Sequence, residues 1–158
     1  MKEGAVLDAS GILRSDLDFT RGDYVITPSA YEEVIAEPAR TVLEEAVNSG
    51  SVRVITPSKQ ALERVTAAAT ATGDLPILSK TDLDVLAAAW ALGLPAITDD
   101  YAIQNTAAHL GIKCIHTSQE GIRRRFSWVW MCSGCGRETE GPGECEVCGH
   151  KARRKRRY

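Results

Sequence analysis

The chain has 158 residues, of which 44% are hydrophobic and 25% are charged, and its formal net charge at pH 7 is −2. At this length it can bury one ordinary core and carry a small appended module. No apolar run approaches the ~18 residues of a membrane-spanning helix, and the N-terminal residues do not resemble a signal peptide, so we expect a cytoplasmic protein without membrane segments.

Short apolar runs alternate with segments of helical character over most of the chain. Runs bounded by Gly or Pro predict strands, while Pro, Ser or Thr at helix starts and Gly at helix ends delimit the helices. The expected strands lie within residues 4–10, 51–57, 95–100 and 111–117, and the expected helices span residues 28–37, 38–48, 58–72, 81–92 and 100–110. This alternation predicts an α/β fold with a mostly parallel central sheet flanked by helices.

The organisation of the chain changes after residue 118. Residues 1–118 are expected to form the α/β domain, followed by a linker without clear periodicity over residues 119–127. The sequence FSWVWMC then alternates aromatic and other residues, as a strand does, and leads into a cysteine-rich module over residues 128–150. Residues 151–158, KARRKRRY, carry six cationic residues in eight and are expected to form a basic C-terminal tail.

Four of the five cysteines form two CxxC pairs, each followed by Gly: Cys132, Cys135, Cys145 and Cys148. Two residues between the cysteines allow a tight turn to direct both sulfurs at one ion, and four thiolates complete a tetrahedral zinc site with no open position. Two disulfides, a redox pair and an iron site are the alternatives, but a reducing compartment favours metal ligands. The sequence therefore predicts a zinc ribbon with one structural zinc ion, whose binding supplies on the order of 10 kcal/mol toward folding.

Positive charge is concentrated near the C-terminus. Residues 1–120 contain 9 Lys and Arg against 17 Asp and Glu, whereas residues 121–158 contain 10 against 4. Such an asymmetry favours a nucleic-acid partner, although a disordered, solubilising tail is the common alternative. The candidate RNA-binding residues are Arg123, Arg124, Arg125, Arg153, Arg154, Lys155, Arg156 and Arg157. Trp128, Trp130 and Tyr158 offer rings for unpaired bases, though packing against the body is expected for at least one tryptophan.

Acidic residues follow two of the expected strands and occupy two of the expected helices. Asp8 ends the first strand, and Asp99 and Asp100 follow the sequence PAIT, at the sheet edge where ligands of open parallel sheets bind. Asp82 and Asp84 open one helix, and Glu32 and Glu33 lie on another. Clustered carboxylates repel one another, and Mg²⁺ or Mn²⁺ would resolve that conflict. At any single position, spacing alone favours helix capping slightly over metal binding, and periodicity does not choose between the two glutamates.

Four segments, VLDAS, TPSAYEEV, LSKTDLDVLAAAWALG and ITDDYAIQN, together resemble a PIN-domain ribonuclease. Combined with CSGCG and CEVCG, they resemble the archaeal NIN-one-binding endonucleases, PIN enzymes with a zinc ribbon. The resemblance implies that Mg²⁺ or Mn²⁺ binds Asp8, Glu33, Asp82 and Asp100 or its neighbour Asp99, with Ser10 and Thr98 beside the metal. The PIN pattern of Thr, any residue, Asp favours Asp100.

The same resemblance implies a metal-dependent endoribonuclease that matures the 3′ end of precursor small-subunit ribosomal RNA within a pre-ribosomal particle. Two other functions remain open at this stage. The chain could be a catalytically silent RNA-binding assembly factor whose acids only cap helices. It could also be a PIN toxin that attacks another RNA, although toxins of that group generally lack a zinc ribbon.

Overall fold

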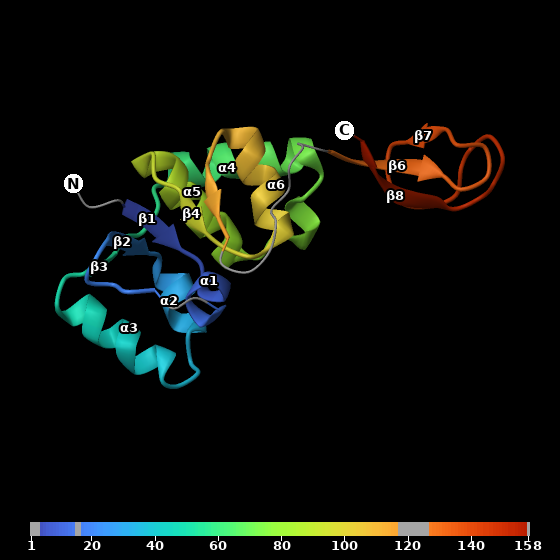
Figure 1. Cartoon of the computed structure of the whole chain (residues 1–158). Coiled ribbons are helices and arrows are strands. Elements are labelled where there is room, and N and C mark those ends of the chain that lie inside the picture. The colour runs from blue at the N-terminus through green and yellow to red at the C-terminus, as the bar shows by residue number, and fades with distance from the viewer. Residues whose placement is uncertain (1–3, 15–16, 117–126, 158) are drawn as a thin grey trace.

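The computed structural model describes residues 4–14, 17–116 and 127–157. Residues 4–116 form an α/β unit, called the body below, and residues 127–157 form a small antiparallel unit, called the ribbon (Figure 1). No helix among the described residues is long and apolar enough to span a membrane.

The body is built on one five-stranded sheet with the order β3-β2-β1-β4-β5. Its strands are β1 (Gly4–Leu7), β2 (Asp23–Ile26), β3 (Val52–Val54), β4 (Ala96–Ile97) and β5 (Cys114–Ile115). All neighbouring pairs are parallel, which confirms the predicted sheet type. The strand order reverses on either side of β1, so the carboxyl ends of β1 and β4 flank the crevice where ligands of such sheets bind.

Helices pack around this sheet in two groups. They are α1 (Ala9–Arg14), α2 (Pro28–Glu33), α3 (Ala39–Asn48), α4 (Lys59–Thr72), α5 (Lys80–Leu92) and α6 (Tyr101–Leu110), with a short 3₁₀ turn η1 (Leu75–Ile77). One core cluster joins the sheet to α2, α3 and one side of α5, and a second joins α4, α6 and the other side of α5. Figure 1 accordingly shows α3 beside β2 and β3, and α4, α5 and α6 grouped together. The helix α5 is therefore buried on two sides.

Local sequence signals explain several helix boundaries. The hydroxyls of Ser58 and Ser79 accept hydrogen bonds from the third residue of α4 and α5, respectively. Ser79 and Asp82 complete a reciprocal capping box at the start of α5. At the other end of α4, Gly73 adopts a positive φ of 77°, which ends the helix in the left-handed conformation that favours glycine.

Three local elements differ from the sequence-based expectation. The strand β2 was not predicted, because its sequence DYVI is short and begins with a polar residue, yet it pairs with both β1 and β3. Residues 9–14, of which the first two were expected in the first strand, form α1. Helix α2 ends at Glu33 instead of Glu37, because the backbone turns at Val34 and places that side chain, with 0% exposure, in the core.

The ribbon contains β6 (Ser127–Cys132), β7 (Glu138–Thr139) and β8 (Ala152–Arg157) in the order β7-β6-β8. Residues 152–157, expected as a separate tail, pair in antiparallel fashion with all of β6 and so belong to the ribbon sheet. The backbone ladder with β6 gives this charged segment an order that its composition did not suggest. Of the expected linker, residues 119–126 lie outside the described residues, and Ser127 begins β6.

The ribbon contacts the body at the C-terminal end of α4. The side chain of Arg154 donates a hydrogen bond to the carbonyl oxygen of Gly73. A Cβ atom on Gly73 would lie 2.7 Å from Cβ of Trp128, so the backbone at the end of α4 and the start of β6 are in close contact. Glycine at position 73 therefore allows the helix to end with a positive φ, and it also leaves room for the ribbon to pack closely against the end of α4.

Candidate functional site

Asp8 lies directly after β1, at the carboxyl edge of the sheet. Its carboxylate oxygen Oδ2 accepts hydrogen bonds from the hydroxyls of Ser10, at 2.7 Å, and Thr98, at 2.8 Å. Only 4% of the residue is exposed. Burial raises the pKa of the Asp8 carboxyl, the two hydroxyls partly oppose that shift, and the charge of Asp100 adds to it. Asp8 is thus a carboxylate held in one orientation in an environment that disfavours its charge.

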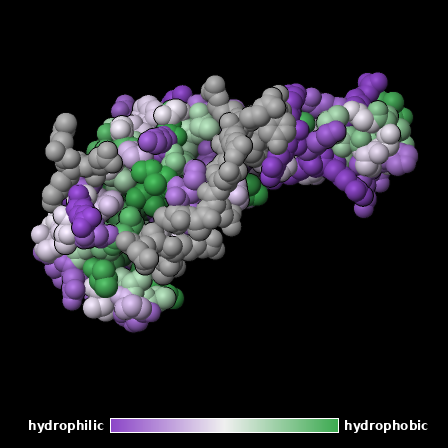
Figure 2. All heavy atoms as spheres, viewed as in Figure 1, coloured by the Kyte–Doolittle hydropathy of each residue, from purple (hydrophilic) through white to green (hydrophobic). Residues whose placement is uncertain are grey.

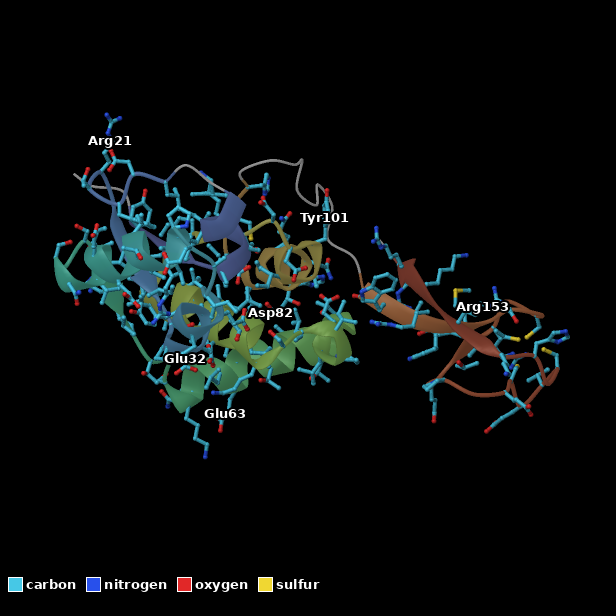
Figure 3. All side chains as sticks on the ribbon, turned by 90° about the horizontal axis from the view of Figure 1, so that it is seen from below. Arg21, Glu32, Glu63, Asp82, Tyr101 and Arg153 are labelled. Carbon is cyan, nitrogen blue, oxygen red and sulfur yellow. The ribbon has the colours of Figure 1, made fainter. Side chains whose placement is uncertain are left out.

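Asp82 and Asp100 lie close enough to Asp8 to interact with it electrostatically. Asp82 is half-buried in the first turn of α5, and burial raises the pKa of its carboxyl. The backbone amide of Ser79 lowers this pKa, whereas the charges of Asp100 and Asp8 raise it. The three acids therefore repel one another, as carboxylates do when they share a site. Figure 3 shows Asp82 among many oxygen-bearing side chains of the body.

Asp99 and Asp100 have different surroundings although they are adjacent. Asp100 caps α6, with its Oδ1 accepting from the amide of Ala102 at 2.9 Å, and its charge acts on both Asp8 and Asp82. The amide of Asp100 also donates to the hydroxyl of Thr98, at 3.1 Å, which ties it to the hydroxyl that binds Asp8. Asp99 is 8% exposed, and Asp100 is the acid whose charge raises the pKa of both Asp8 and Asp82. This geometry favours Asp100 as the third acid.

Glu33, which like Glu32 is exposed at the end of α2, is bound to α5. The hydroxyl of Thr81, the residue before Asp82, donates to Glu33 Oε1 at 2.6 Å. Glu32 is exposed on α2 and has no such bond to α5 among the described residues. The hydrogen bond to Thr81 therefore distinguishes Glu33 from Glu32, which helical periodicity could not do.

Asp84 forms a second link between α2 and α5 that the sequence did not assign to the site. Its Oδ2 accepts from the hydroxyl of Ser29 at 2.6 Å and lies 3.9 Å from the ammonium of Lys80. Ser29 and Glu33 are one helical turn apart on α2, so both ends of this short helix are bound to α5. Asp84 therefore links α2 to α5 through Ser29. The only feature of the sequence that could have indicated this link is the serine at the second position of α2, Ser29.

The acidic group is more open than a closed metal cage. Among the described residues, the carboxylates do not form a set of three or more whose ligand oxygens all lie within 4.8 Å of one another. Mg²⁺ and Mn²⁺ usually keep several of their water ligands, so an open arrangement of acids fits either ion. The raised pKa values of Asp8 and Asp82 also fit a bound cation. Part of each increase comes from repulsion between the carboxylates, and a cation would relieve that repulsion.

The four cysteines of the CxxC pairs gather in the ribbon. Their sulfurs all lie within 4.8 Å of one another, with 3.2 Å between Cys132 and Cys148 and 3.7 Å between Cys135 and Cys145. Tetrahedral zinc with bonds of ~2.3 Å places its sulfur ligands about 3.8 Å apart. None of the four is in a disulfide. The cluster therefore fits one tetrahedral ion, and Figure 3 shows sulfur atoms at the end of the ribbon away from the body.

Backbone amides of the two turns stabilise thiolates in this cluster. The amide of Gly134 lies 3.3 Å from the sulfur of Cys132. The amide of His150, together with the side chains of Cys132 and His150, lowers the pKa of the Cys148 thiol to about 7. Deprotonated sulfur is the form that binds zinc, so these amides favour the required state at Cys148. At Cys135 the amide of Arg137 also lowers the pKa, but burial and the neighbouring thiols outweigh it and raise the pKa to about 11.

The basic residues are divided between described and undescribed parts of the chain. Arg123, Arg124 and Arg125 lie outside the described residues. Residues 153–157 lie on β8, where Arg154 and Arg156 stack on the ring of Trp128, with centroid distances of 4.7 Å and 5.2 Å. Trp128 therefore packs within the contact between ribbon and body, as was expected for at least one tryptophan.

Known proteins match both parts of this architecture. Residues 5–92 match the family described as PIN domain of ribonuclease. The chain is 40% identical over 152 residues to a protein named endoribonuclease Nob1 from Pyrococcus abyssi, covering 94% of this chain and 91% of that protein. It is 35% identical over 161 residues to a second protein of that name, from Methanothermobacter thermautotrophicus, covering 96% and 92%.

A further relative carries a different name. The chain is 34% identical over 150 residues to ribonuclease VapC1 from Thermoplasma acidophilum, covering 94% of this chain and 76% of that protein. All of these relatives are named as ribonucleases, and their similarity extends over both the body and the ribbon. The chain is therefore an endoribonuclease of the PIN-domain family that includes the archaeal Nob1 enzymes.

Proposed function

We propose that this endoribonuclease uses Mg²⁺ or Mn²⁺ to cleave precursor small-subunit ribosomal RNA at its 3′ end, within a pre-ribosomal particle. The observation that carries the proposal is the meeting of Asp8, Asp82 and Asp100 at the carboxyl edge of β1 and β4, with raised pKa values at the first two. The name of the relative from Pyrococcus abyssi, endoribonuclease Nob1, supports the reaction class.

In this proposal, four carboxylates hold the catalytic cation: Asp8, Glu33, Asp82 and Asp100. The ion would supply a water of lowered pKa and positive charge near the phosphate. Ser10 and Thr98 fix one oxygen of Asp8 by hydrogen bonds, and Thr81 fixes one oxygen of Glu33. These hydroxyls keep the carboxylates in place despite their mutual repulsion. Cleavage would leave a 3′-hydroxyl and a 5′-phosphate.

The ribbon has a separate role in the proposal. The four cysteines bind one structural zinc ion, which leaves no position open for chemistry and stabilises a unit too small to fold by burial alone. The basic strand β8 contributes affinity for RNA phosphates, which gives binding but little sequence selection.

The experiment for this proposal is a cleavage assay on two RNAs. Zinc-loaded full-length protein is incubated, with and without Mn²⁺, with a small-subunit 3′ precursor RNA and with transfer RNA, and the product ends are mapped. We expect Mn²⁺-dependent cleavage at one position of the precursor. Cleavage of transfer RNA alone would favour a toxin, which the VapC1 name makes the second candidate. Metal-insensitive binding without cleavage would indicate a silent assembly factor.

The two glutamates of α2 provide a matched test of the acidic site. Glu33→Gln should slow cleavage at saturating Mn²⁺ at least about tenfold, or ~1.4 kcal/mol in activation free energy, because Thr81 holds this carboxylate beside the turn that carries Asp82. Glu32→Gln removes the same charge from an exposed neighbouring position and should leave the rate within about twofold. Equal rates for the two variants would remove Glu33 from the proposed site.

A further inference from the structure

The basic strand β8 has two chemically different faces. Side chains alternate along a strand, and directly paired residues of neighbouring strands share a face. Arg154 pairs with Trp130 and Arg156 with Trp128, so these four side chains lie on one face of the ribbon. Arg153, Lys155 and Arg157 lie on the other face. We call the face with Arg154 and Arg156 the docking face, and the face with Arg153, Lys155 and Arg157 the outer face. The charges of β8, which follow one another in the sequence, are therefore divided between two faces.

Arg154 on the docking face is committed to the body. Its guanidinium donates to the carbonyl of Gly73, at the end of α4, and stacks 4.7 Å from the ring centroid of Trp128. The last carbonyls of a helix lack partners within the helix and carry partial negative charge, so an arginine at that position is favourable. Arg156 stacks on the same ring at 5.2 Å. These contacts hold both guanidiniums on the docking face, and they tie Arg154 to the body.

On the outer face, no hydrogen bond or ring contact joins Arg153 or Lys155 to the body within the described residues. Arg153 and Lys155 are exposed, and within the part of the chain that the structure describes neither forms an ion pair. Arg157 lies on the same face but forms a salt bridge with Glu138, at 2.9 Å, in which both side chains are more than half exposed. Figure 2 shows hydrophilic side chains over this part of the ribbon, and Figure 3 labels Arg153 on β8. Two cations are therefore available at once, and a third is held by an acid.

We propose that RNA phosphates bind the outer face through Arg153 and Lys155, that Glu138 restrains Arg157 from doing so, and that Arg154 instead fixes the ribbon against the body. This inference rests on the proposed function for its choice of RNA as the polyanion. It differs from a uniformly basic tail because neighbouring residues of one strand have opposite roles. The alternation of β8 and its register with β6 carry the distinction.

The test measures how RNA affinity depends on salt. Each phosphate bound on a single strand contributes about 0.7 to the slope of log affinity against log salt concentration. Zinc-loaded full-length variants are titrated with a fluorescent single-stranded RNA, without added Mg²⁺ or Mn²⁺, and anisotropy is recorded. The double variant R153A/K155A should lower the slope by about 1.4. Arg154→Ala should leave the slope unchanged, and Glu138→Gln should increase it by up to about 0.7 by releasing Arg157.

Controls separate this inference from loss of fold and from failure of the proposed function. The variant K59A/R64A removes two exposed charges from α4 of the body and should not change the slope. Arg154→Lys keeps the charge but loses the planar contacts, so small-angle scattering should show a larger radius of gyration at unchanged slope. An equal loss of slope in Arg154→Ala and R153A/K155A, or no RNA binding by the wild type, overturns the two-face assignment. Normal RNA binding without Mn²⁺-dependent cleavage contradicts only the proposed reaction.

Discussion

Asp8→Asn should lower the rate of RNA cleavage at saturating Mn²⁺ by at least about 100-fold, which corresponds to ~2.7 kcal/mol of activation free energy. The asparagine keeps an oxygen that can accept from Ser10 and Thr98, so the fold around position 8 should persist. It removes the negative charge that would hold the catalytic cation at the centre of the acidic group. Single-turnover cleavage of the 3′ precursor RNA measures this effect, and RNA affinity should stay unchanged.

The same substitution should stabilise the metal-free body. Burial raises the pKa of Asp8, so between its ordinary pKa and its higher folded value the native state binds more protons than the unfolded state. The contribution of this group to stability is therefore present at low pH and is lost as pH rises through the folded pKa. At neutral pH, Asp8→Asn should raise the free energy of unfolding by roughly 1 kcal/mol, a usual gain when a strained functional group is replaced.

Asp23→Asn is the matched control for both measurements. Asp23 starts β2 at the opposite edge of the same sheet and lies 3.4 Å from Arg53, with both side chains about half exposed. An exposed pair of this kind contributes little, so cleavage and stability should both change by small amounts. If Asp8→Asn cleaves as fast as Asp23→Asn, the carboxyl edge of β1 is not the catalytic site.

Cys145→Ser should unfold the ribbon and reduce bound zinc from about one ion per chain to nearly none. Cys145 is 4% exposed, and its sulfur lies 3.7 Å from that of Cys135. A closed zinc site contributes on the order of 10 kcal/mol to the folding of a small unit, far more than the few apolar side chains of the ribbon can supply. Metal analysis and the amide exchange of β6 and β8 measure the loss.

The body should survive this change because it has its own two core clusters. We expect helical circular dichroism close to that of the wild type, with RNA affinity reduced by about tenfold or more through loss of the basic strand. Cys114→Ser is the control, since burial raises the pKa of that thiol to about 12 and it lies outside the cluster. Retained zinc and a protected ribbon in Cys145→Ser would contradict the four-cysteine assignment.

The α/β class and the grouping of the cysteines could be predicted because their signals are local. Strands that alternate with well-capped helices leave few arrangements other than a parallel sheet, and α4 and α5 begin within one residue of the expected helix starts. A CxxC turn places two sulfurs together whatever the rest of the chain does, and only the meeting of the two turns is non-local. The zinc ion itself remains a proposal supported by the fit of the sulfurs.

The acids were a weaker prediction, since each also had a place as a helix cap. Asp82 and Asp100 do cap α5 and α6, so capping and proximity to Asp8 hold together and do not exclude one another. The choice of Asp100 over Asp99, and of Glu33 over Glu32, depends on hydrogen bonds and charges between segments. Such contacts have no signature in the period of a single helix.

The sequence by itself determined the fold class, the cysteine spacing and the concentration of positive charge near the C-terminus, because each depends on residues close together along the chain. Only the tertiary structure decided that Asp8, from the end of β1, meets acids from two other elements, and that residues 152–157 form a strand. The register with β6 then separates Arg153 from Arg154. Both features depend on contacts with strands and helices that are far away in the sequence, so the local sequence pattern does not reveal them.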